Sequence, residues 1–355
     1  MEGSGLRIET LLDTAVNRNA SDLHIQVGSP PTFRINGQLI PYSGEPLSQE
    51  AVLALVHAVL DVEQQKLLES DRELDTAFAF GTIARFRLNA FHEKGHLAAA
   101  FRLIPKTIPS FMSLGIPAVV ETFTDFSKGL VLITGPTGSG KTTTLAALIN
   151  KINHERALHI ITIEDPIEYT YESKRSLIVQ REVHYDTFSF NAALRSSLRQ
   201  DPDVILVGEM RDLETISSAI TLAETGHLVF ATLHTNSAGA SIDRMVNIFP
   251  AEQQLLIRAQ LANILQGICS QRLLPALKGG RIAACEILVA NHAVRGIIRE
   301  GKTHQLDAVI QTGIDQGMQT MDRTLAKLVK NGTISYDVAI EAVNDLPEFE
   351  RMVRR

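Results

Sequence analysis

The feature that most constrains the fold of this chain is a glycine-rich stretch between a short apolar run and a helical pattern. The stretch comprises Gly135, Pro136, Thr137, Gly138, Ser139, Gly140, Lys141, Thr142 and Thr143. The apolar run at 130–133 predicts a buried strand, and the pattern at 143–149 predicts a helix. A strand, this turn and a helix, in that order, form a phosphate-binding loop, so we expect an α/β domain that binds a nucleoside triphosphate.

The residue types in the loop match the chemistry of a bound triphosphate. Glycines at positions 135, 138 and 140 let backbone N–H groups turn toward phosphate oxygens, and the positive end of the following helix faces the same anion. Lys141 is expected to neutralise the β- and γ-phosphates, and Thr142 is expected to hold Mg²⁺. The alternative, a chance glycine-rich turn ahead of a helix, does not account for the complete pattern in this context.

The length and charge of the chain narrow the class of protein. At 355 residues it exceeds the usual size of one domain, so two domains are expected, and 45% hydrophobic residues can bury a substantial core. The formal net charge of −6 gives no overall basic field of the kind that drives nonspecific binding to nucleic acid. A nucleic-acid partner is therefore not expected, although a local basic lining would escape this average.

Neither the cysteines nor the apolar runs indicate secretion or a membrane span. Cys269 and Cys285 are too few for a cysteine-based zinc module or a disulfide framework, which favours two buried thiols in a reducing compartment. The N-terminus lacks a signal-peptide pattern, and no run approaches the roughly eighteen apolar residues that a membrane span needs. We expect a soluble, cytoplasmic protein without direct membrane insertion, which meets the membrane through a partner.

Four segments are expected along the chain. A small α+β domain at 1–106 precedes a proline-rich linker at 107–115, a nucleotide-binding core at 116–290 and a C-terminal helical region at 291–355. The first domain is expected to contain a helix at 6–16, a strand at 23–27, a hairpin turn at Asn36-Gly37, a helix at 49–69, and strands at 76–90 and 97–103.

Acidic residues follow two further strand patterns downstream of the loop. Glu164 and Asp165 end an apolar run that begins at Ile160, and Glu209 follows the run at 204–207 after one glycine. Because ligands bind at the carboxyl ends of strands in an open α/β sheet, a carboxylate there can activate an attacking water or reach Mg²⁺. For Glu164 and Asp165 the alternative is an ordinary turn before a proline.

Histidines bracket the fourth strand pattern, which covers 228–233. His227 precedes this pattern and His234 follows it. Each histidine taken alone is more often a structural residue. Two of them at one strand of a nucleotide-binding sheet indicate a sensor of the γ-phosphate.

Taken together, these segments resemble the secretion ATPase superfamily of type II and type IV machines, and they are most similar to its type IV pilus retraction ATPases, the PilT-like branch. The family's acidic box corresponds to 163–169, its atypical Walker B motif to 201–212 and its histidine box to 225–236. The resemblance covers nearly the whole chain. It implies a RecA-like P-loop ATPase domain that hydrolyses ATP with Mg²⁺.

The resemblance also implies a role for each candidate residue of the site. Glu164 corresponds to the carboxylate that activates water, and Glu209 to the acid associated with Mg²⁺, which Thr142 also holds. His227 and His234 correspond to a phosphate-sensing pair. These assignments make 135–143 the cofactor-binding loop and the four acidic and histidine side chains the catalytic set.

The resemblance extends to both ends of the chain. Residues 20–24 and 85–87 are similar to the family's PAS-like N-terminal domain, and 293–300 is similar to the C-terminal helix that marks retraction ATPases. Helical spacing predicts three buried residues, namely Val294, Ile297 and Ile298, and an exposed face with Arg295 and Arg299. Gly296 departs from the polar residue usual at its position. Assembly and secretion ATPases usually carry a longer N-terminal extension and a tetracysteine insertion, which this sequence lacks, so retraction is the expected function.

The family resemblance implies a homohexamer in which an arginine of one subunit reaches the phosphates of the next. The candidate arginines are Arg85, Arg87, Arg102, Arg195 and Arg199. Each of them taken alone is more often a surface or ion-pair residue. The expected partner is an inner-membrane pilus platform protein, with a second retraction ATPase as a further possibility, and the expected location is the inner face of the cytoplasmic membrane.

Three other functions stay open at this point. An ATPase of the same superfamily can power pilus assembly or type II secretion, or serve as an accessory retraction ATPase. A DNA-translocating motor is disfavoured by the acidic pI of about 6.0 and by the lack of a basic groove interleaved with aromatic residues. A nucleotide-binding regulator without hydrolysis conflicts with the intact set of Lys141, Glu164 and Glu209.

Overall fold

The computed structural model of the protein describes residues 6–35, 37–81, 83–104 and 107–354. The chain divides into two compact units. The first comprises Met1–Thr107 with Pro166–Thr170, and the second comprises Ile108–Asp165 with Tyr171–Arg355. Pro105 and Lys106, in the proline-rich stretch where the sequence places the domain boundary, lie outside the described residues. In the described part of the chain, no helix has both the length and the apolar character that a membrane span requires.

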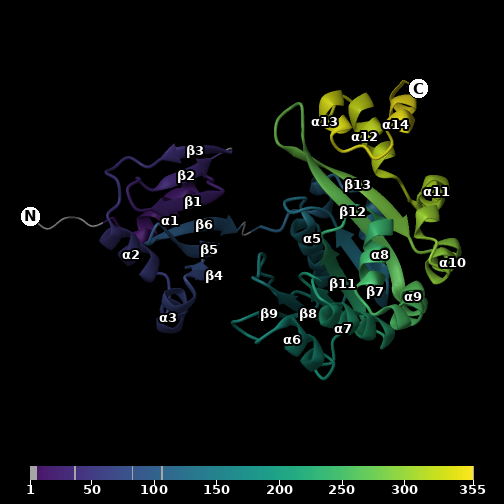
Figure 1. Cartoon of the computed structure of the whole chain (residues 1–355), viewed down its shortest axis with the longest axis horizontal. Coiled ribbons are helices and arrows are strands. Elements are labelled where there is room, and N and C mark those ends of the chain that lie inside the picture. Colours follow the sequence, from purple (N-terminus) through teal and green to yellow (C-terminus); the bar gives the residue numbers. More distant parts are fainter. Residues whose placement is uncertain (1–5, 36, 82, 105–106, 355) are drawn as a thin grey trace, which may run out of the picture. The chain divides into compact units, whose positions relative to one another are not determined.

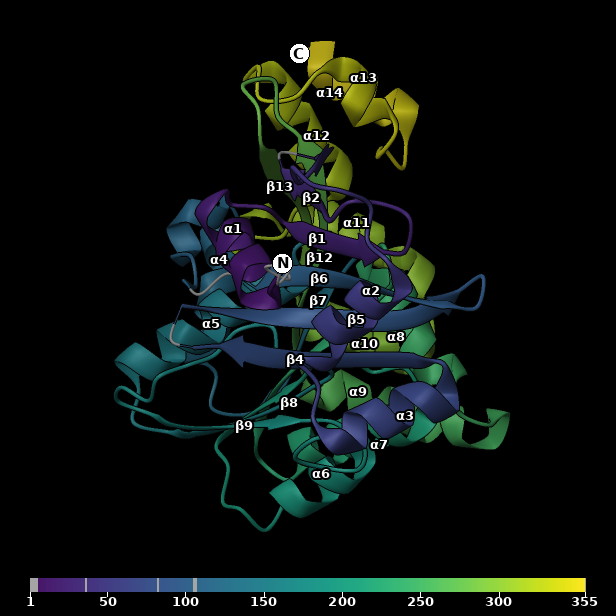
Figure 2. The same cartoon turned by 90° about the vertical axis from the view of Figure 1, so that its left-hand side faces the viewer.

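The first unit is an antiparallel sheet of six strands in the order β3-β2-β1-β6-β5-β4. Its elements are α1 (Ile8–Asn17), β1 (Asp22–Gln26), β2 (Thr32–Ile35), β3 (Gln38–Pro41), α2 (Gln49–His57), α3 (Val62–Asp71), β4 (Glu73–Phe80), β5 (Ala84–Glu93) and β6 (His96–Ile104). The three helices cover one face of the sheet (Figures 1 and 2). Alternate strand residues and the apolar sides of the helices form one core, which includes Leu12, Phe33 and Phe101.

Three expectations for this unit need correction or fall outside the description. The single helix expected at 49–69 is two helices, because the carboxylate of Asp61 caps the amide of Gln64 at 2.8 Å and starts a new helix. The single strand expected at 76–90 is wrong, because the chain turns after Phe80 and returns as β5. In the turn expected at Asn36-Gly37, Asn36 lies outside the described residues, although β2 and β3 pair as a hairpin requires.

The second unit contains a sheet of seven strands in the order β13-β12-β7-β11-β10-β8-β9. Its strands are β7 (Gly129–Thr134), β8 (His159–Glu164), β9 (Leu177–Glu182), β10 (Val204–Val207), β11 (Leu228–Leu233), β12 (Leu265–Pro275) and β13 (Arg281–Val289). All neighbours are parallel except the β12–β13 pair. The carboxyl ends of β7, β8, β10 and β11 therefore share one edge, which is where an α/β sheet binds its ligand.

Helices cover both faces of this sheet (Figure 1). They are α4 (Ala118–Glu121), α5 (Lys141–Glu155), α6 (Phe190–Ser197), α7 (Leu213–Glu224), α8 (Ala238–Asn247) and α9 (Ala251–Ile264), with 3₁₀ turns at Phe111–Leu114 and Thr122–Asp125. Alternate residues of β7 point to opposite faces of the sheet. Leu130 and Leu132 pack with α7, α8 and α9 on one face, whereas Val131 and Ile133 pack with α5 on the other. Burial on both faces explains why the central strands are continuous apolar runs.

The chain after β13 is helical, as expected for 291–355. The elements are α10 (His292–Glu300), α11 (Leu306–Thr312), α12 (Met321–Lys330), α13 (Tyr336–Ile340) and α14 (Leu346–Arg354), with 3₁₀ turns at Thr303–Gln305 and Ile314–Gln316. Helix α12 packs on β13, and the last three helices share a small apolar core with Leu274 and Ala284 of the β12–β13 hairpin. Cys269 and Cys285, on the two strands of this hairpin, are free and buried.

Helix α10 corrects one expectation about its arginines. Val294 and Ile298 are buried, as the helical spacing predicts, whereas Ile297, which was also expected to be buried, is half-buried. Arg295, which was expected on an exposed face, is half-buried and donates through Nη1 to the carbonyl oxygens of Ala262 at 2.5 Å and Asn263 at 2.8 Å. These carbonyls belong to the last turn of α9, where backbone acceptors lack helical partners. Arg295 therefore joins α10 to the end of α9.

Candidate nucleotide-binding site

The glycine-rich loop lies between β7 and α5, as the sequence predicts. Gly135 has φ of +144°, and a Cβ atom at this position would lie 2.2 Å from the carbonyl oxygen of Gln271 and 2.6 Å from Oγ of Ser139. Only glycine fits this close approach of two backbone segments. Helix α5 begins at Lys141, so its N-terminal amides face the loop.

Lys141 is nearly buried, with 8% of its surface exposed. Its ammonium group donates to the carbonyl oxygens of Gly135 at 2.8 Å and Pro136 at 3.1 Å. These contacts hold the charge inside the loop, where the amides and the start of α5 converge. This is the geometry that neutralises a β- or γ-phosphate.

Strand β12 supports the loop through a side chain that the sequence analysis did not single out. Gln271 is 2% exposed; its Nε2 donates to the carbonyl oxygen of Ser139 at 2.7 Å, and its Oε1 accepts from Oγ1 of Thr144 at 3.0 Å. One strand residue earlier, Oγ of Ser270 lies 2.8 Å from Oγ1 of Thr134 at the end of β7. The signal available in the sequence was a polar run at 270–272 between the apolar residues of the strand.

Glu164 is the last residue of β8 and is 6% exposed. Oγ1 of Thr162 donates to its carboxylate at 2.6 Å, and Nε2 of Gln180 on β9 donates at 3.4 Å. These two donors fix the orientation of the carboxylate at the edge of the sheet that the loop occupies. A buried and oriented carboxylate is suited to accept a proton from a water molecule.

Gly208 brings the end of β10 close to Glu164. Its amide donates to the carbonyl oxygen of Ile163 at 2.8 Å, and a Cβ atom at Gly208 would lie 3.2 Å from that oxygen and 3.3 Å from Cα of Glu164. On the other side, Oγ1 of Thr232 donates to the carbonyl oxygen of Gly208 at 2.5 Å. The glycine before Glu209 therefore lets two neighbouring strand ends approach more closely than most side chains would allow.

Glu209 and His234 extend the site from the loop across the sheet edge. Nε2 of His234 lies 3.0 Å from Oε1 of Glu209, and its Nδ1 lies 3.5 Å from Oγ1 of Thr137 in the loop. Nη2 of Arg211 contacts the other carboxylate oxygen at 2.8 Å. Burial alone would raise the pKa of Glu209, but the hydrogen bond from Arg211 and the charge of His234 outweigh it and lower this pKa. Glu209 is therefore ionised at neutral pH.

The expected pairing of His227 with His234 is wrong within one chain. His227 lies at the amino end of β11, where its carbonyl oxygen accepts from the amide of Gly129, and its Nδ1 lies 2.9 Å from the carbonyl oxygen of Leu222. His234 lies beyond the carboxyl end of the same strand. Seven residue steps of extended chain separate them by roughly 23 Å. His227 connects α7 to the start of β7 and β11, and within one chain it lies far from the loop residue Thr137 that His234 contacts.

The candidate arginines fall into two groups. Arg87 pairs with Asp75 at 2.7 Å and Arg102 pairs with Asp22 at 3.0 Å, both within the first unit, where Arg85 also lies on β5. In the second unit, Arg195 lies in the last turn of α6 and Arg199 follows the helix, and both are exposed. A phosphate-binding role for any of these five arginines stays a prediction.

The residues present fit Mg²⁺ held partly by a nucleotide. In the part of the chain that the structure describes, no group of three or more His, Cys, Asp or Glu side chains forms a metal cage. Mg²⁺ characteristically takes one or two protein ligands and completes its shell with phosphates and water. Thr142, in the first turn of α5, and the ionised Glu209 are side chains of the right chemistry.

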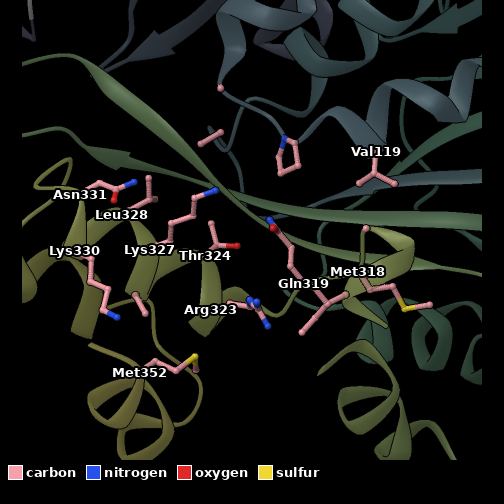
Figure 3. A pocket seen from close by; sticks show the side chains of 16 residues that line it. Val119, Met318, Gln319, Arg323, Thr324, Lys327, Leu328, Lys330, Asn331 and Met352 are labelled. Atoms are coloured by element: carbon pink, nitrogen blue, oxygen red, sulfur yellow. The ribbon is translucent and has the colours of Figure 1, made fainter. Parts of the chain in front are cut away.

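A separate cavity of about 810 Å³ lies away from these residues. Its lining comes from 115–119, 314–319 and α12, and Figure 3 shows Lys327 and Thr324 of α12 turned toward it. None of the loop, acidic or histidine residues lines this cavity. The candidate site residues lie instead at the carboxyl edge of the sheet, so cavity size does not locate them.

Comparison with known proteins gives consistent matches. The family model described as type II/IV secretion system protein matches residues 6–279. The type IV pilus retraction ATPase PilT of Pseudomonas aeruginosa is 48% identical over 341 residues, which is 96% of this chain and 99% of that protein. A twitching motility protein of Neisseria gonorrhoeae is 49% identical over 310 residues, 87% of this chain and 83% of that protein. The crystal structure of the pilus retraction motor PilT with bound ADP superposes with a TM-score of 0.91 at 47% identity and covers 98% of this chain and 99% of that one.

Proposed function

The chain belongs to the type II/IV secretion system protein family, and from this we propose that it is an ATP-hydrolysing motor that powers the retraction of a type IV pilus. The observation that carries the proposal is the set of contacts from Thr137 in the phosphate-binding loop through His234 to Glu209. This set joins the loop to an ionised acid at the carboxyl edge of the sheet. Similarity to a pilus retraction ATPase over nearly the full length of both proteins supports the specific task.

The loop residues bind and orient the triphosphate in this proposal. Backbone amides of the loop and of the start of α5 surround the phosphates, and Lys141 contributes the positive charge. Thr142 and Glu209 hold Mg²⁺, which when bound neutralises charge on the β- and γ-phosphates. Arg211 keeps Glu209 ionised and so maintains its affinity for the cation.

Glu164 and His234 act on the γ-phosphate side of the site. Glu164, held by Thr162 and Gln180, accepts the proton of the attacking water. His234 lies between the loop and Glu209, so the loss of the γ-phosphate changes its hydrogen bonds on one side. That change is the local event from which a movement of the loop after β11 starts.

The working assembly that we propose is a homohexamer. In such a ring an arginine from a neighbouring subunit can meet the γ-phosphate. Arg85, Arg87, Arg102 and Arg195 are the candidates for this contact. The ring acts on an inner-membrane platform protein of the pilus, at the inner face of the cytoplasmic membrane, with or without a second retraction ATPase.

The test of the biological role is a count of surface pili in cells that lack the gene. The parent strain, the deletion strain and strains complemented with the wild type, Lys141→Ala or Glu209→Gln are compared. Excess pili that do not retract, restored to normal by the wild type and by neither variant, are expected. Loss of pili would instead indicate an assembly motor, and an unchanged number would contradict any direct role in the pilus.

The test of the chemistry uses the purified full-length protein. Release of phosphate from ATP is expected with Mg²⁺ and is expected to cease when EDTA removes the cation. Glu209→Gln is expected to retain nucleotide binding and to lose turnover. Absence of turnover in wild-type protein that has assembled into rings would favour a nucleotide-binding regulator over a motor.

A further inference from the structure

The cavity of about 810 Å³ lies within the second unit and apart from the nucleotide site. Its walls are the segments at 115–119 and 314–319 and helix α12, and Ala283 of β13 and Met352 of α14 complete the lining. Sites that bind small molecules usually have volumes of about 300–1000 Å³. The cavity therefore has the size of such a site, and its lining indicates which chemical class fits.

Close packing and backbone hydrogen bonds fix the walls of the cavity. Gly317 has φ of +83°, and a Cβ atom there would lie 2.6 Å from Cγ2 of Val119, so the two wall segments touch. The amide of Ile287 on β13 donates to the carbonyl oxygen of Gln319 at 2.8 Å, and the amide of Gln319 donates back at 3.2 Å. The cavity is therefore part of the packed structure of this unit.

The buried part of the lining is apolar. Its buried and half-buried side chains include Ala283, Met318, Ala326, Val119 and Leu328. Two polar side chains there, Gln319 and Thr324, both donate to the carbonyl oxygen of Cys285, at 3.0 Å and 2.7 Å. None of the described residues that line the cavity is aromatic. The interior thus offers hydrocarbon contacts and little free hydrogen bonding, which suits an alkyl chain better than an extended peptide or a stacked nucleobase.

The exposed part of the lining is cationic. Arg323, Lys327 and Lys330 are spaced at i, i+4 and i+7 on α12, so they share one face of the helix over roughly 10 Å. Figure 3 shows these three side chains around the cavity. Among the described residues after α11, Arg351 and Arg354 form ion pairs, whereas none of these three cations does. The cavity therefore combines an apolar interior with a positively charged opening.

The nearby carboxylates do not neutralise this opening. Asp322 precedes Arg323 in the chain, but it is only 6% exposed and accepts from the amides of Asn344 and Asp345 at 2.8 Å each. Asp315 is exposed, and neither aspartate belongs to the lining. The chain as a whole carries a net charge of −6, so the positive sign of the opening is a local feature. Its electrostatic complement is an anion.

We propose that this cavity binds an amphiphilic anion with one alkyl chain. The chain occupies the apolar interior, and a phosphate or carboxylate head group meets Arg323 and Lys327 at the opening. The guanidinium group presents a fork of donors that matches phosphate or carboxylate oxygens, and the ammonium group one turn further along α12 supplies a second charge. The cavity shares no residue with the nucleotide site, so the proposal does not depend on ATP hydrolysis.

The first experiment is a calorimetric titration of the full-length protein, without nucleotide, with dodecyl phosphate below its micelle-forming concentration. Saturable binding of one molecule per chain is expected. Hexyl phosphate is expected to bind at least about a hundredfold more weakly, since each buried methylene contributes about fourfold. Dodecyltrimethylammonium, which carries a similar chain with the opposite charge, is expected not to bind. Equal affinity for the two chain lengths or for the two head groups would overturn the proposal.

Charge-reversal variants test the location of the head group. Lys327→Glu is expected to weaken binding of dodecyl phosphate at least about tenfold. Lys128→Glu is the matched control, because Lys128 is also an exposed lysine but does not line the cavity, and its affinity is expected to stay within about twofold of the wild type. Equal affinities in these two variants would refute the assigned site.

The phosphate-binding loop is the competing site for a phosphate head group. Lys141→Ala is therefore titrated as well, and it is expected to bind dodecyl phosphate within about twofold of the wild type. Loss of binding in Lys141→Ala together with normal binding in Lys327→Glu would place the molecule in the loop and overturn the proposal. Circular dichroism of each variant checks that it is folded.

Hydrogen exchange locates the bound molecule independently of the variants. Peptides covering 314–331 are expected to exchange at least about threefold more slowly in wild-type protein saturated with dodecyl phosphate. Protection confined to other parts of the chain would contradict binding in this cavity. Absence of saturable binding in the titration would also overturn the proposal and would leave the cationic row of α12 to an acidic segment of a protein.

Sedimentation with vesicles distinguishes the two sources of such an anion. Binding to phosphatidylglycerol vesicles but not to phosphatidylcholine vesicles, lost in Lys327→Glu, would support the proposal with a membrane lipid as the source. Dodecyl phosphate binding without vesicle binding would support it with a soluble acyl compound as the source. Vesicle binding that is equal in Lys327→Glu and in the wild type would contradict a lipid held at this opening.

Discussion

Substitution of Gln271 tests whether β12 supports the phosphate-binding loop. Gln271→Ala removes the donor to the carbonyl oxygen of Ser139 and the acceptor for Thr144. Thr144 retains the carbonyl oxygen of Gly140 as an alternative acceptor at 3.1 Å, so its loss is partly compensated. The oxygen of Ser139 loses a buried donor, which costs about 1–3 kcal/mol, and the second bond adds about 1 kcal/mol at most. We expect the free energy of unfolding of the second unit to fall by about 1–4 kcal/mol.

The assay is urea unfolding followed by circular dichroism, together with calorimetric titration of ATP in the presence of Mg²⁺. Because the same hydrogen bond shapes the loop, ATP is expected to bind at least about tenfold more weakly to Gln271→Ala, which corresponds to about 1.4 kcal/mol. Gln271→Met fills the space without forming hydrogen bonds and is expected to be no better, which separates hydrogen bonding from cavity formation.

A control on the same strand is Gln266→Ala. Gln266 also donates to a backbone carbonyl, that of Lys128 at 3.0 Å, but it lies at the opposite end of β12 from the loop. Its replacement is expected to leave the affinity for ATP unchanged. If Gln271→Ala unfolded within about 0.5 kcal/mol of the wild type and bound ATP equally well, or if Gln271→Met restored both properties, the supporting role of the hydrogen bonds would be refuted.

Three further substitutions test individual groups of the site. Lys141→Ala is expected to weaken ATP binding by at least about a hundredfold in a calorimetric titration, since the buried ammonium has no substitute; affinity within about threefold of the wild type would contradict its role. His234→Ala is expected to lower kcat by more than about tenfold, whereas His227→Ala keeps kcat within about twofold; equal losses would restore the two histidines as a pair. Arg211→Ala removes a hydrogen bond that lowers the pKa of Glu209, so this pKa is expected to rise. The acid limb of the kcat–pH profile should then move to higher pH. An unchanged acid limb would show that it does not report the ionisation of Glu209.

The central strands of the second unit could be predicted from the sequence because burial on both faces leaves them as apolar runs with polar ends. The runs at 204–207 and 228–233 coincide with β10 and β11, and the α/β ATPase fold is confirmed by the superposition on a pilus retraction motor. Strands β12 and β13 were not identified, because Gln271 and Glu286 interrupt their apolar pattern. Both polar residues are buried and satisfied by backbone groups from distant segments, which a local pattern does not reveal.

The errors in the sequence reading have local physical causes that were visible in the sequence. Asp61 and Gln64 form a capping box that starts a helix, but helical periodicity on both sides masked it. His227 and His234 were grouped because they bracket one strand, although a strand of that length places its two ends at opposite edges of the sheet. Helical spacing places Arg295 on the exposed side of its helix. In the structure α10 packs against α9, and the guanidinium group of Arg295 donates hydrogen bonds to backbone carbonyl oxygens there.

The β12–β13 hairpin connects the nucleotide site to the C-terminal helices through both of its faces. On one face Gln271 holds the loop at Ser139, and on the other Glu286 holds the start of α8. The two strands are joined by a continuous antiparallel ladder from Gly267–Val289 to Pro275–Arg281, so neither contact can move far without the other. The segment just before α12 and its first turn are hydrogen-bonded to β13 at Ile287 and Cys285, on either side of Glu286. A displacement of the loop, or of the segment after His234, therefore reaches the C-terminal helices through the β12–β13 hairpin.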